Sequence, residues 1–210
     1  MSKGVELQGK ATRLYEQGNF EEAVKVFEEA IAAYEAENNA VMAAEMRVNL
    51  ALTHSELEAH ETALELLQES LAFFKEMNDQ LREAKVLGNM ALVYSRVDER
   101  DQAETFYREA AILFKELGEN SLYAETVLAL GDMQFRAGKI MDAVATFEAA
   151  LDGVKAQNHR QKILKQLLLM KNRMLGGGTV TENHTDDETS DEDTSENNRR
   201  QRRRLRRSRG

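Results

Sequence analysis

The stretch ETALELLQESLAFFKEM, residues 61–77, carries the pattern that decides the fold. Small and large side chains follow one another in it at helical spacing: Ala63 and Ser70 are small, and Leu67, Leu71 and Phe74 are large. The pattern recurs every 40 residues, from Ala23, Ala103 and Ala143, with Phe27, Tyr107 and Phe147 four positions later. Internal repeats of this length are typical of stacked supersecondary units. The sequence therefore predicts four stacked units.

Each 40-residue period contains two helical patterns separated by a turn. Met46, Leu50 and Leu57 place an apolar face at a period near 3.6 before the helix of residues 61–77 begins. Glycine and asparagine tolerate the left-handed conformation that ends many helices. Turn residues recur 40 apart, within the periods at Gly18, Glu58, Asp98 and Gly138, and between them at Asn38, Asn78, Gly118 and Asn158. We therefore expect an all-α fold with two helices per unit.

The chain resembles the tetratricopeptide repeat family in three segments. These are Asn49 to Ser70, with NLA and LEAHETALELLQES; Gly88 to Ala110, with GNMALVY and DQAETFYREA; and LGDMQFRAGKIMDAVATFEAA, Leu130 to Ala150. The family's usual period is 34 residues, whereas here it is 40 and proline is absent. That is similar to the long-repeat branch of Pins-type polarity adaptors, kinesin light chains and Rap-like regulators. The resemblance implies a right-handed superhelical solenoid of four helix-turn-helix units over residues 4–158, at about 4–39, 40–79, 80–119 and 120–158.

Two further segments follow the repeats. Residues 159–175, HRQKILKQLLLMKNRML, place Ile163, Leu167, Met170 and Met174 on one stripe and contain no acid. We expect a helix that caps the last unit, and a basic amphipathic helix for a membrane or a partner is the alternative. Residues 176–210 form an acidic and then arginine-rich tail with almost no apolar side chain, a composition that predicts disorder.

Composition argues against several classes of protein. Cysteine is absent, which excludes disulfides and thiolate metal sites, and the four histidines lack metal-ligand spacing. We therefore expect no catalytic residue, no metal and no cofactor, and hence no enzyme. The chain has no apolar run near the roughly 20 residues of a membrane span and no export signal at its start, so a cytoplasmic location is expected.

The first helix of each unit lines a concave, peptide-binding groove in tetratricopeptide arrays. The groove positions of the family fall here on Gln8, Thr12, Tyr15, Glu16, Glu45, Val48, Asn49, Leu52, Ser55, Glu56, Lys85, Asn89, Leu92, Ser95, Arg96, Glu125, Leu128, Asp132, Phe135 and Arg136. Long-repeat relatives use an asparagine, here Asn49 and Asn89, to hold the backbone of an extended ligand. The acids among these residues favour a basic or amphipathic partner segment.

The resemblance and the composition together predict a non-catalytic adaptor or scaffold that binds a protein or peptide segment. The alternative is a nucleic-acid-associated protein whose tail contacts phosphates without base specificity. A third hypothesis is that the tail folds back onto the acidic groove. The arginines concerned are Arg199, Arg200, Arg202, Arg203, Arg204, Arg206, Arg207 and Arg209.

Overall fold

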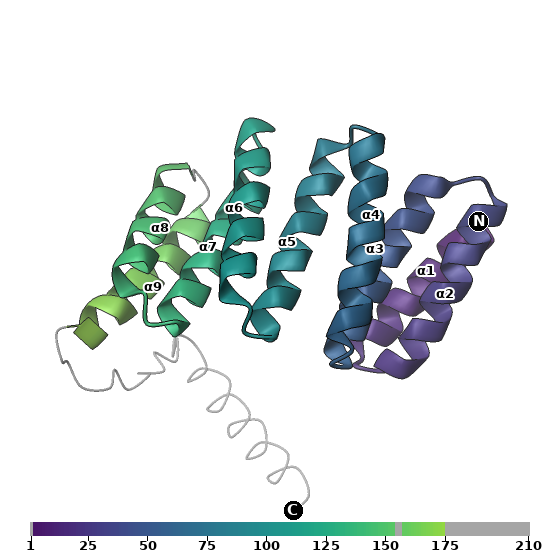
Figure 1. Cartoon of the computed structure of the whole chain (residues 1–210), viewed down its shortest axis with the longest axis horizontal. Coiled ribbons are helices and arrows are strands. Elements are labelled where there is room, and N and C mark those ends of the chain that lie inside the picture. Colours follow the sequence, from purple (N-terminus) through teal and green to yellow (C-terminus); the bar gives the residue numbers. More distant parts are fainter. Residues whose placement is uncertain (1, 154–156, 175–210) are drawn as a thin grey trace, which may run out of the picture. The chain divides into compact units, whose positions relative to one another are not determined.

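The computed structural model describes residues 2–153 and 157–174, and these lie almost entirely in α-helices (Figure 1). No strand occurs among them, so the prediction of an all-α fold is confirmed. The predicted tail, residues 176–210, lies outside the described residues. The helices are α1 Lys3–Glu16, α2 Phe20–Ala36, α3 Ala40–Glu56, α4 His60–Glu76, α5 Gln80–Arg96, α6 Arg100–Glu116, α7 Asn120–Arg136, α8 Ile140–Gly153 and α9 Gln157–Met174.

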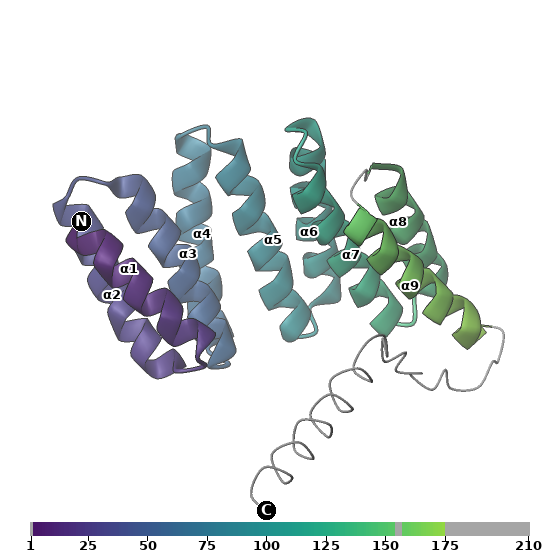
Figure 2. The same cartoon turned by 180° about the vertical axis from the view of Figure 1, so that it is seen from behind.

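The helices pack in the order in which they occur in the chain. From α1 to α8 each helix contacts the next, and α3 also contacts α5. Figures 1 and 2 show the row from α1 at one end to α9 at the other. Helices α1, α3, α5 and α7 are called the first helices below, and α2, α4, α6 and α8, which follow them, are the second helices. Residues up to Lys171 form one compact unit, and the unit that begins at Asn172 falls almost wholly outside the described residues.

The small residues of the repeated pattern lie where two helices of a pair meet. Ala23, Ala63, Ala103 and Ala143 are completely buried. Large side chains of the second helices fit against small residues of the first: a Cβ added to Gly131 would lie 2.5 Å from the Phe147 ring. Because small residues let helix backbones approach closely, the pattern sets the distance between the helices of each pair.

Seven of the eight predicted turn residues adopt the left-handed conformation. Their φ angles run from 54° to 78°, at Gly18, Asn38, Glu58, Asn78, Asp98, Gly118 and Gly138. In the turn after α3 the Ala59 N–H donates to the His54 carbonyl over 2.9 Å and the Glu58 N–H donates to Ser55. This is the hydrogen-bond pattern by which a left-handed residue closes a helix C-terminus.

The eighth turn prediction, at Asn158, is wrong. Helix α8 is described as far as Gly153, and residues 154–156 lie outside the described residues. Helix α9 then begins at Gln157, so that Asn158 lies inside it.

Glycine and glutamate occupy equivalent turns, and exchanging them should change stability in opposite directions. We expect Glu58→Gly to raise the free energy of unfolding by about 0.5–1 kcal/mol, because a left-handed glutamate is strained. Gly18→Glu should lower it by about 1–2 kcal/mol. An added Cβ at Gly18 meets nothing within 4 Å, so the effect comes from the backbone. Urea unfolding measures the change in the free energy of unfolding for each variant. If the two changes had the same sign, the left-handed glutamate would not be strained.

Candidate functional site

Three adjoining hollows run along the first helices. One hollow of about 270 Å³ is lined by Thr12, Tyr15, Glu16, Phe27, Asn49 and Leu52. The next, of about 230 Å³, is lined by Gln8, Glu45, Met46, Val48, Asn49, Phe74, Arg82, Lys85, Val86 and Asn89. The third, of about 390 Å³, is lined by Lys85, Gly88, Asn89, Leu92, Tyr107, Phe114, Leu122, Glu125, Thr126 and Ala129. Because Asn49, Lys85 and Asn89 each line two hollows, we treat the three as one groove.

Most of the groove residues expected from the sequence line these hollows. Among the residues singled out as the site, these are Tyr15, Glu45, Asn49, Leu52, Lys85, Asn89, Leu92 and Glu125. The other five, Ser55, Arg96, Asp132, Phe135 and Arg136, line none of the three. All five lie in the last two turns of their first helices.

Ser55 and Arg96 belong to a network that joins three first helices. The Arg96 guanidinium donates to Ser55 Oγ over 2.9 Å and to Glu56 Oε1 over 2.6 Å. The Tyr15 hydroxyl donates to the same Glu56 oxygen over 3.5 Å. Burial raises the pKa of the Tyr15 phenol, and the negative charge of Glu56 raises it further. The charge of Glu56 is therefore compensated within the protein.

The fourth first helix ends in a half-buried carboxyl and a ring that packs on the core. Burial raises the pKa of Asp132, and the positive charge of Arg136 partly offsets the rise. Asp132 in turn acts on Tyr107, whose pKa burial raises to about 12. Phe135 packs against the cluster that contains Phe147 and Ile163. Asp132 and Phe135 thus face protein atoms to a large extent.

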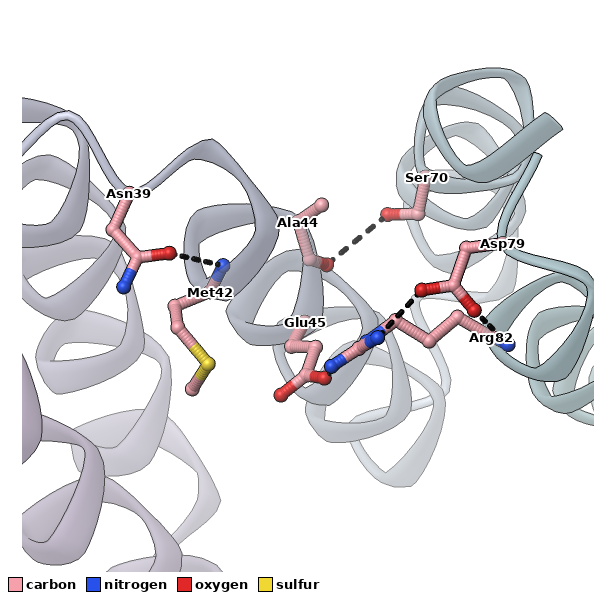
Figure 3. Close-up of polar contacts among 7 residues, drawn as sticks. All are labelled: Asn39, Met42, Ala44, Glu45, Ser70, Asp79 and Arg82. Atoms are coloured by element: carbon pink, nitrogen blue, oxygen red, sulfur yellow. Dashed lines mark hydrogen bonds and ion pairs between the residues drawn. The ribbon is translucent and has the colours of Figure 1, made fainter. Parts of the chain in front are cut away.

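Arg82 is a groove residue that sequence reasoning missed, and it changes the charge of the groove. Its guanidinium forms an ion pair with Glu45 of the preceding first helix and another with Asp79 (Figure 3). It also lies 6.0 Å from the centre of the Phe74 ring, at cation–π distance. Glu45 is therefore compensated, and the groove is less acidic than the sequence indicates. Arg82 and Glu45 are 37 residues apart, so the pairing becomes visible only in the folded chain.

Asp79 fixes Arg82 in place by capping the helix that carries it. Its Oδ1 accepts the Arg82 backbone N–H over 3.0 Å, as Asn39 does for Met42 at the start of α3 over 3.2 Å (Figure 3). Burial alone would raise the pKa of Asp79, but the hydrogen bonds from the Arg82 backbone and guanidinium lower it below its ordinary value. The carboxylate form of Asp79 is thus stabilised in the folded chain.

Asn49 and Asn89 occupy the same position in consecutive first helices. Both are partly exposed, and each lines two hollows. Across residues 2–153 and 157–174 neither side-chain amide hydrogen-bonds another protein group. The corresponding residues of the outer pairs are Gly9 and Ala129, which have no polar side chain. The two free amides therefore lie together in the middle of the groove.

The floor of the groove comes from the second helices. Phe27, Phe74, Tyr107 and Phe114 line the hollows, whereas the sequence pattern assigned them only to packing between helices. Each lies at a large position of the repeat, so the repeated pattern could have identified them. They make the inner surface of the groove apolar beneath a polar rim.

No catalytic constellation forms in the described part of the chain. The closest approach to one is Ser55 Oγ at 3.4 Å from His60 Nδ1, but Ser55 is 3% exposed and accepts a bond from Arg96. No group of His, Asp and Glu within residues 2–153 and 157–174 could hold a metal ion. None of the described helices is long and apolar enough to cross a membrane. The arginines proposed to contact polyanions lie outside the described residues.

Comparisons with known proteins agree with this architecture. The profile of a family described as tetratricopeptide repeat matches residues 7–76 and 82–156. No curated protein sequence matches. Among solved structures, the apo form of RapI is 18% identical, with a TM-score of 0.68 over 83% of this chain and 50% of RapI.

Two further solved structures have the same fold. The kinesin light chain repeats of Podospora anserina are 14% identical, with a TM-score of 0.60 over 83% of this chain and 99% of that chain. The Rap conjugation regulator of plasmid pLS20, solved with the Phr* peptide, is 14% identical. Its TM-score is 0.65, over 80% of this chain and 47% of the regulator. At these identities the likeness concerns the fold alone.

The variant Asp79→Asn tests the negative charge of the residue that caps the start of α5. Asparagine keeps the oxygen that accepts the Arg82 backbone N–H but has no charge. The folded-state pKa of Asp79 is below its unfolded value, so the carboxylate stabilises the protein above the unfolded pKa. That contribution is lost as the pH falls through the folded pKa. We expect the variant to be less stable by up to about 1 kcal/mol at pH 7 and this difference to shrink as the pH falls through the folded-state pKa of Asp79. Urea unfolding of both proteins from pH 7 downward measures this difference. A difference in the free energy of unfolding that did not change with pH would contradict the stabilising role of the Asp79 carboxylate.

Proposed function

The chain belongs to the tetratricopeptide repeat family, and from this premise we propose that it is a non-catalytic adaptor that binds a protein or peptide segment along the groove. The family resemblance implies that the first helices line such a surface, and the three hollows that run along these helices support it. The proposal includes the four units at about residues 4–39, 40–79, 80–119 and 120–158, followed by α9, and a location in the cytoplasm.

The observation that carries the proposal is the pair of unengaged amides at Asn49 and Asn89. A side-chain amide donates and accepts hydrogen bonds at once, which matches the N–H and C=O of a ligand backbone. Two such groups, one repeat apart, suit an extended segment that crosses successive first helices. Leaving these groups without a partner while a ligand covers them would be costly. A ligand in this groove therefore has reason to bond with both.

The hollows beside the asparagines suit apolar side chains of the ligand. Tyr15, Phe27 and Leu52 surround the hollow next to Asn49, and Tyr107, Phe114 and Leu92 line the hollow next to Asn89. Burying an apolar side chain there contributes roughly 1.5–3 kcal/mol. A segment that combines apolar side chains with an exposed backbone fits this surface.

The charged residues on the rim of the groove indicate which charges a partner segment should carry. Glu45 and Glu56 are paired with arginines of the protein, so they offer little attraction to a basic ligand. Glu16 is an exposed acid at the α1 end of the groove, and Lys85 is an exposed cation in its middle. An amphipathic segment with its basic residues near Glu16 therefore suits the groove better than a uniformly basic one.

A solved relative supports this use of the fold. The Rap regulator of pLS20 was solved in complex with the Phr* peptide. Its identity to this chain is too low to transfer the peptide or its contacts. What it supports is that an array of this architecture binds a peptide.

The test is an Asn49→Ala/Asn89→Ala variant measured against peptides selected from a displayed peptide library with the wild-type chain. Losing two amide pairs should cost about 1–3 kcal/mol of binding free energy, which is roughly a tenfold to hundredfold loss of affinity. Fluorescence anisotropy measures this loss. The double variant should keep the melting temperature of the wild type, because the two amides make no hydrogen bond within the described chain.

Asn120→Ala is the matched control, because Asn120 is exposed at the start of α7 and lines none of the three hollows. It should bind the selected peptides as the wild type does. Selected peptides that bind the double variant equally well would rule out the role of the asparagines. A library that yields no groove-binding peptide at all would overturn the proposed function.

A further inference from the structure

Helix α9 presents an apolar stripe that no described helix covers. Ile163 and Met170 are buried against the core cluster of α7 and α8, whereas Leu164 is 54% exposed and Leu168 is 52% exposed. Leu164, Leu168 and Lys171 are spaced by four and three residues and therefore lie on one side of the helix. These three residues and Lys165 are called the end face below. They line none of the hollows of the groove, so the end face is a separate surface.

The period of 40 residues shows what the end face corresponds to. Ile163, Leu167 and Met170 fall at the positions of Tyr123, Val127 and Leu130 in α7, which face the preceding helices. By the same register Leu164 and Lys171 fall at the positions of Ala124 and Gly131. Those two residues are buried in α7, and Gly131 faces the Phe147 ring of α8. The end face is thus the surface on which a second helix would pack.

All four first helices have small residues at these two positions. The first position is occupied by Gly4, Ala44, Ala84 and Ala124, and the second by Ala11, Ala51, Ala91 and Gly131. All eight are buried. An added Cβ at Gly4 would lie 2.6 Å from Tyr34, so these positions have no room for a larger residue when a second helix with aromatic residues packs there.

Leu164 and Lys171 are large residues at the two positions where all four first helices have small ones. A helix shaped like α2, α4, α6 or α8 would bring a large side chain against each of them, and the two helices would be held apart. A helix that approaches closely must have small residues opposite both. In the second helices the opposing residues are seven apart, as Phe27 and Tyr34 are. The end face therefore fits a helix with small residues at i and i+7.

Charge defines the same partner further. The described part of α9 contains lysines at 162, 165 and 171, all exposed, and no acid. Two copies of the end face would bring these lysines together, which disfavours symmetric pairing. The residues before 176 carry the whole net charge of −9, since the tail has eight acids and eight arginines, so an anionic membrane would attract α9 but repel the rest of the array. A helix flanked by Glu or Asp complements Lys165 and Lys171 locally.

We propose that the end face of α9 is a second docking surface, which binds a partner protein through an acidic amphipathic helix with alanine or glycine at two positions seven residues apart. Leu164 and Leu168 provide the apolar contact, and Lys165 and Lys171 favour a partner helix with negative charges. The partner helix packs on α9 as a second helix packs on its first helix. Here, however, the large side chains lie on α9 and the small ones on the partner.

The test uses three synthetic helical peptides of equal length and the full chain. The first peptide has alanines seven apart with glutamates on both sides, the second has lysines in place of the glutamates, and the third has phenylalanines in place of the alanines. Fluorescence anisotropy should show binding of the first and at least roughly tenfold weaker binding of the other two. Equal binding of the three, or no binding of the first, overturns the proposal.

Variants locate the binding on the end face. Leu164→Ser/Leu168→Ser and Lys165→Gln/Lys171→Gln should each weaken the first peptide by roughly tenfold or more. Ile112→Ser, at a residue of α6 that is 57% exposed, should leave it unchanged. Unaltered binding by the α9 variants contradicts the proposal.

Two other measurements detect other occupants of the end face. Self-association of the full chain in sedimentation velocity that Leu164→Ser/Leu168→Ser abolishes would assign the face to a second copy instead. Flotation of the full chain with phosphatidylserine vesicles, lost in the same variant, would assign it to a membrane. Absence of both, together with binding of the first peptide, supports the proposal.

Discussion

The structure depends on one contact that recurs along the chain, a large side chain of each second helix set against a small residue of its first helix. Where that residue is glycine there is no spare room: an added Cβ would lie 2.5 Å from Phe147 at Gly131 and 2.6 Å from Tyr34 at Gly4. Close packing of this kind is felt at the level of a single methyl group. The contact fixes how far apart the two helices of a pair lie and how they are rotated. Stacking then follows, because one pair cannot bury both of its faces alone.

The groove is a consequence of the same contact. Phe27, Phe74, Tyr107 and Phe114 hold the helix pairs together and also line the hollows beneath the first helices. On the rim, Glu45 with Arg82 and Glu56 with Arg96 join neighbouring first helices. Packing and rim contacts therefore place Asn49 and Asn89 at corresponding points of adjacent helices. The two amides remain without a partner between rim carboxylates that are paired with arginines.

The repeat made the helices and most turns predictable from the sequence, and the resemblance to the family did the same for much of the groove lining. A period of 40 fixes which residues are equivalent, and one correct turn therefore predicts the others. The prediction failed at Asn158, which lies inside α9 and not in a turn. It also gave no account of Ser55, Glu45 or Glu56 as paired groups. Their partners are 37 to 41 residues away in sequence, and a helical pattern gives a residue's face but not what lies opposite it.

Two glycines of the first helices provide the most direct test of the central contact. Gly131 faces the buried Phe147 ring, whereas an added Cβ at Gly88 meets nothing within 4 Å. Alanine is favoured over glycine in a helix by roughly 1 kcal/mol, so Gly88→Ala should raise the free energy of unfolding by about that amount. Gly131→Ala should lower it by about 1–3 kcal/mol, because the added methyl group overpacks the contact. Urea unfolding of the two variants side by side decides the matter: opposite signs are predicted, and stabilisation by both would contradict the contact.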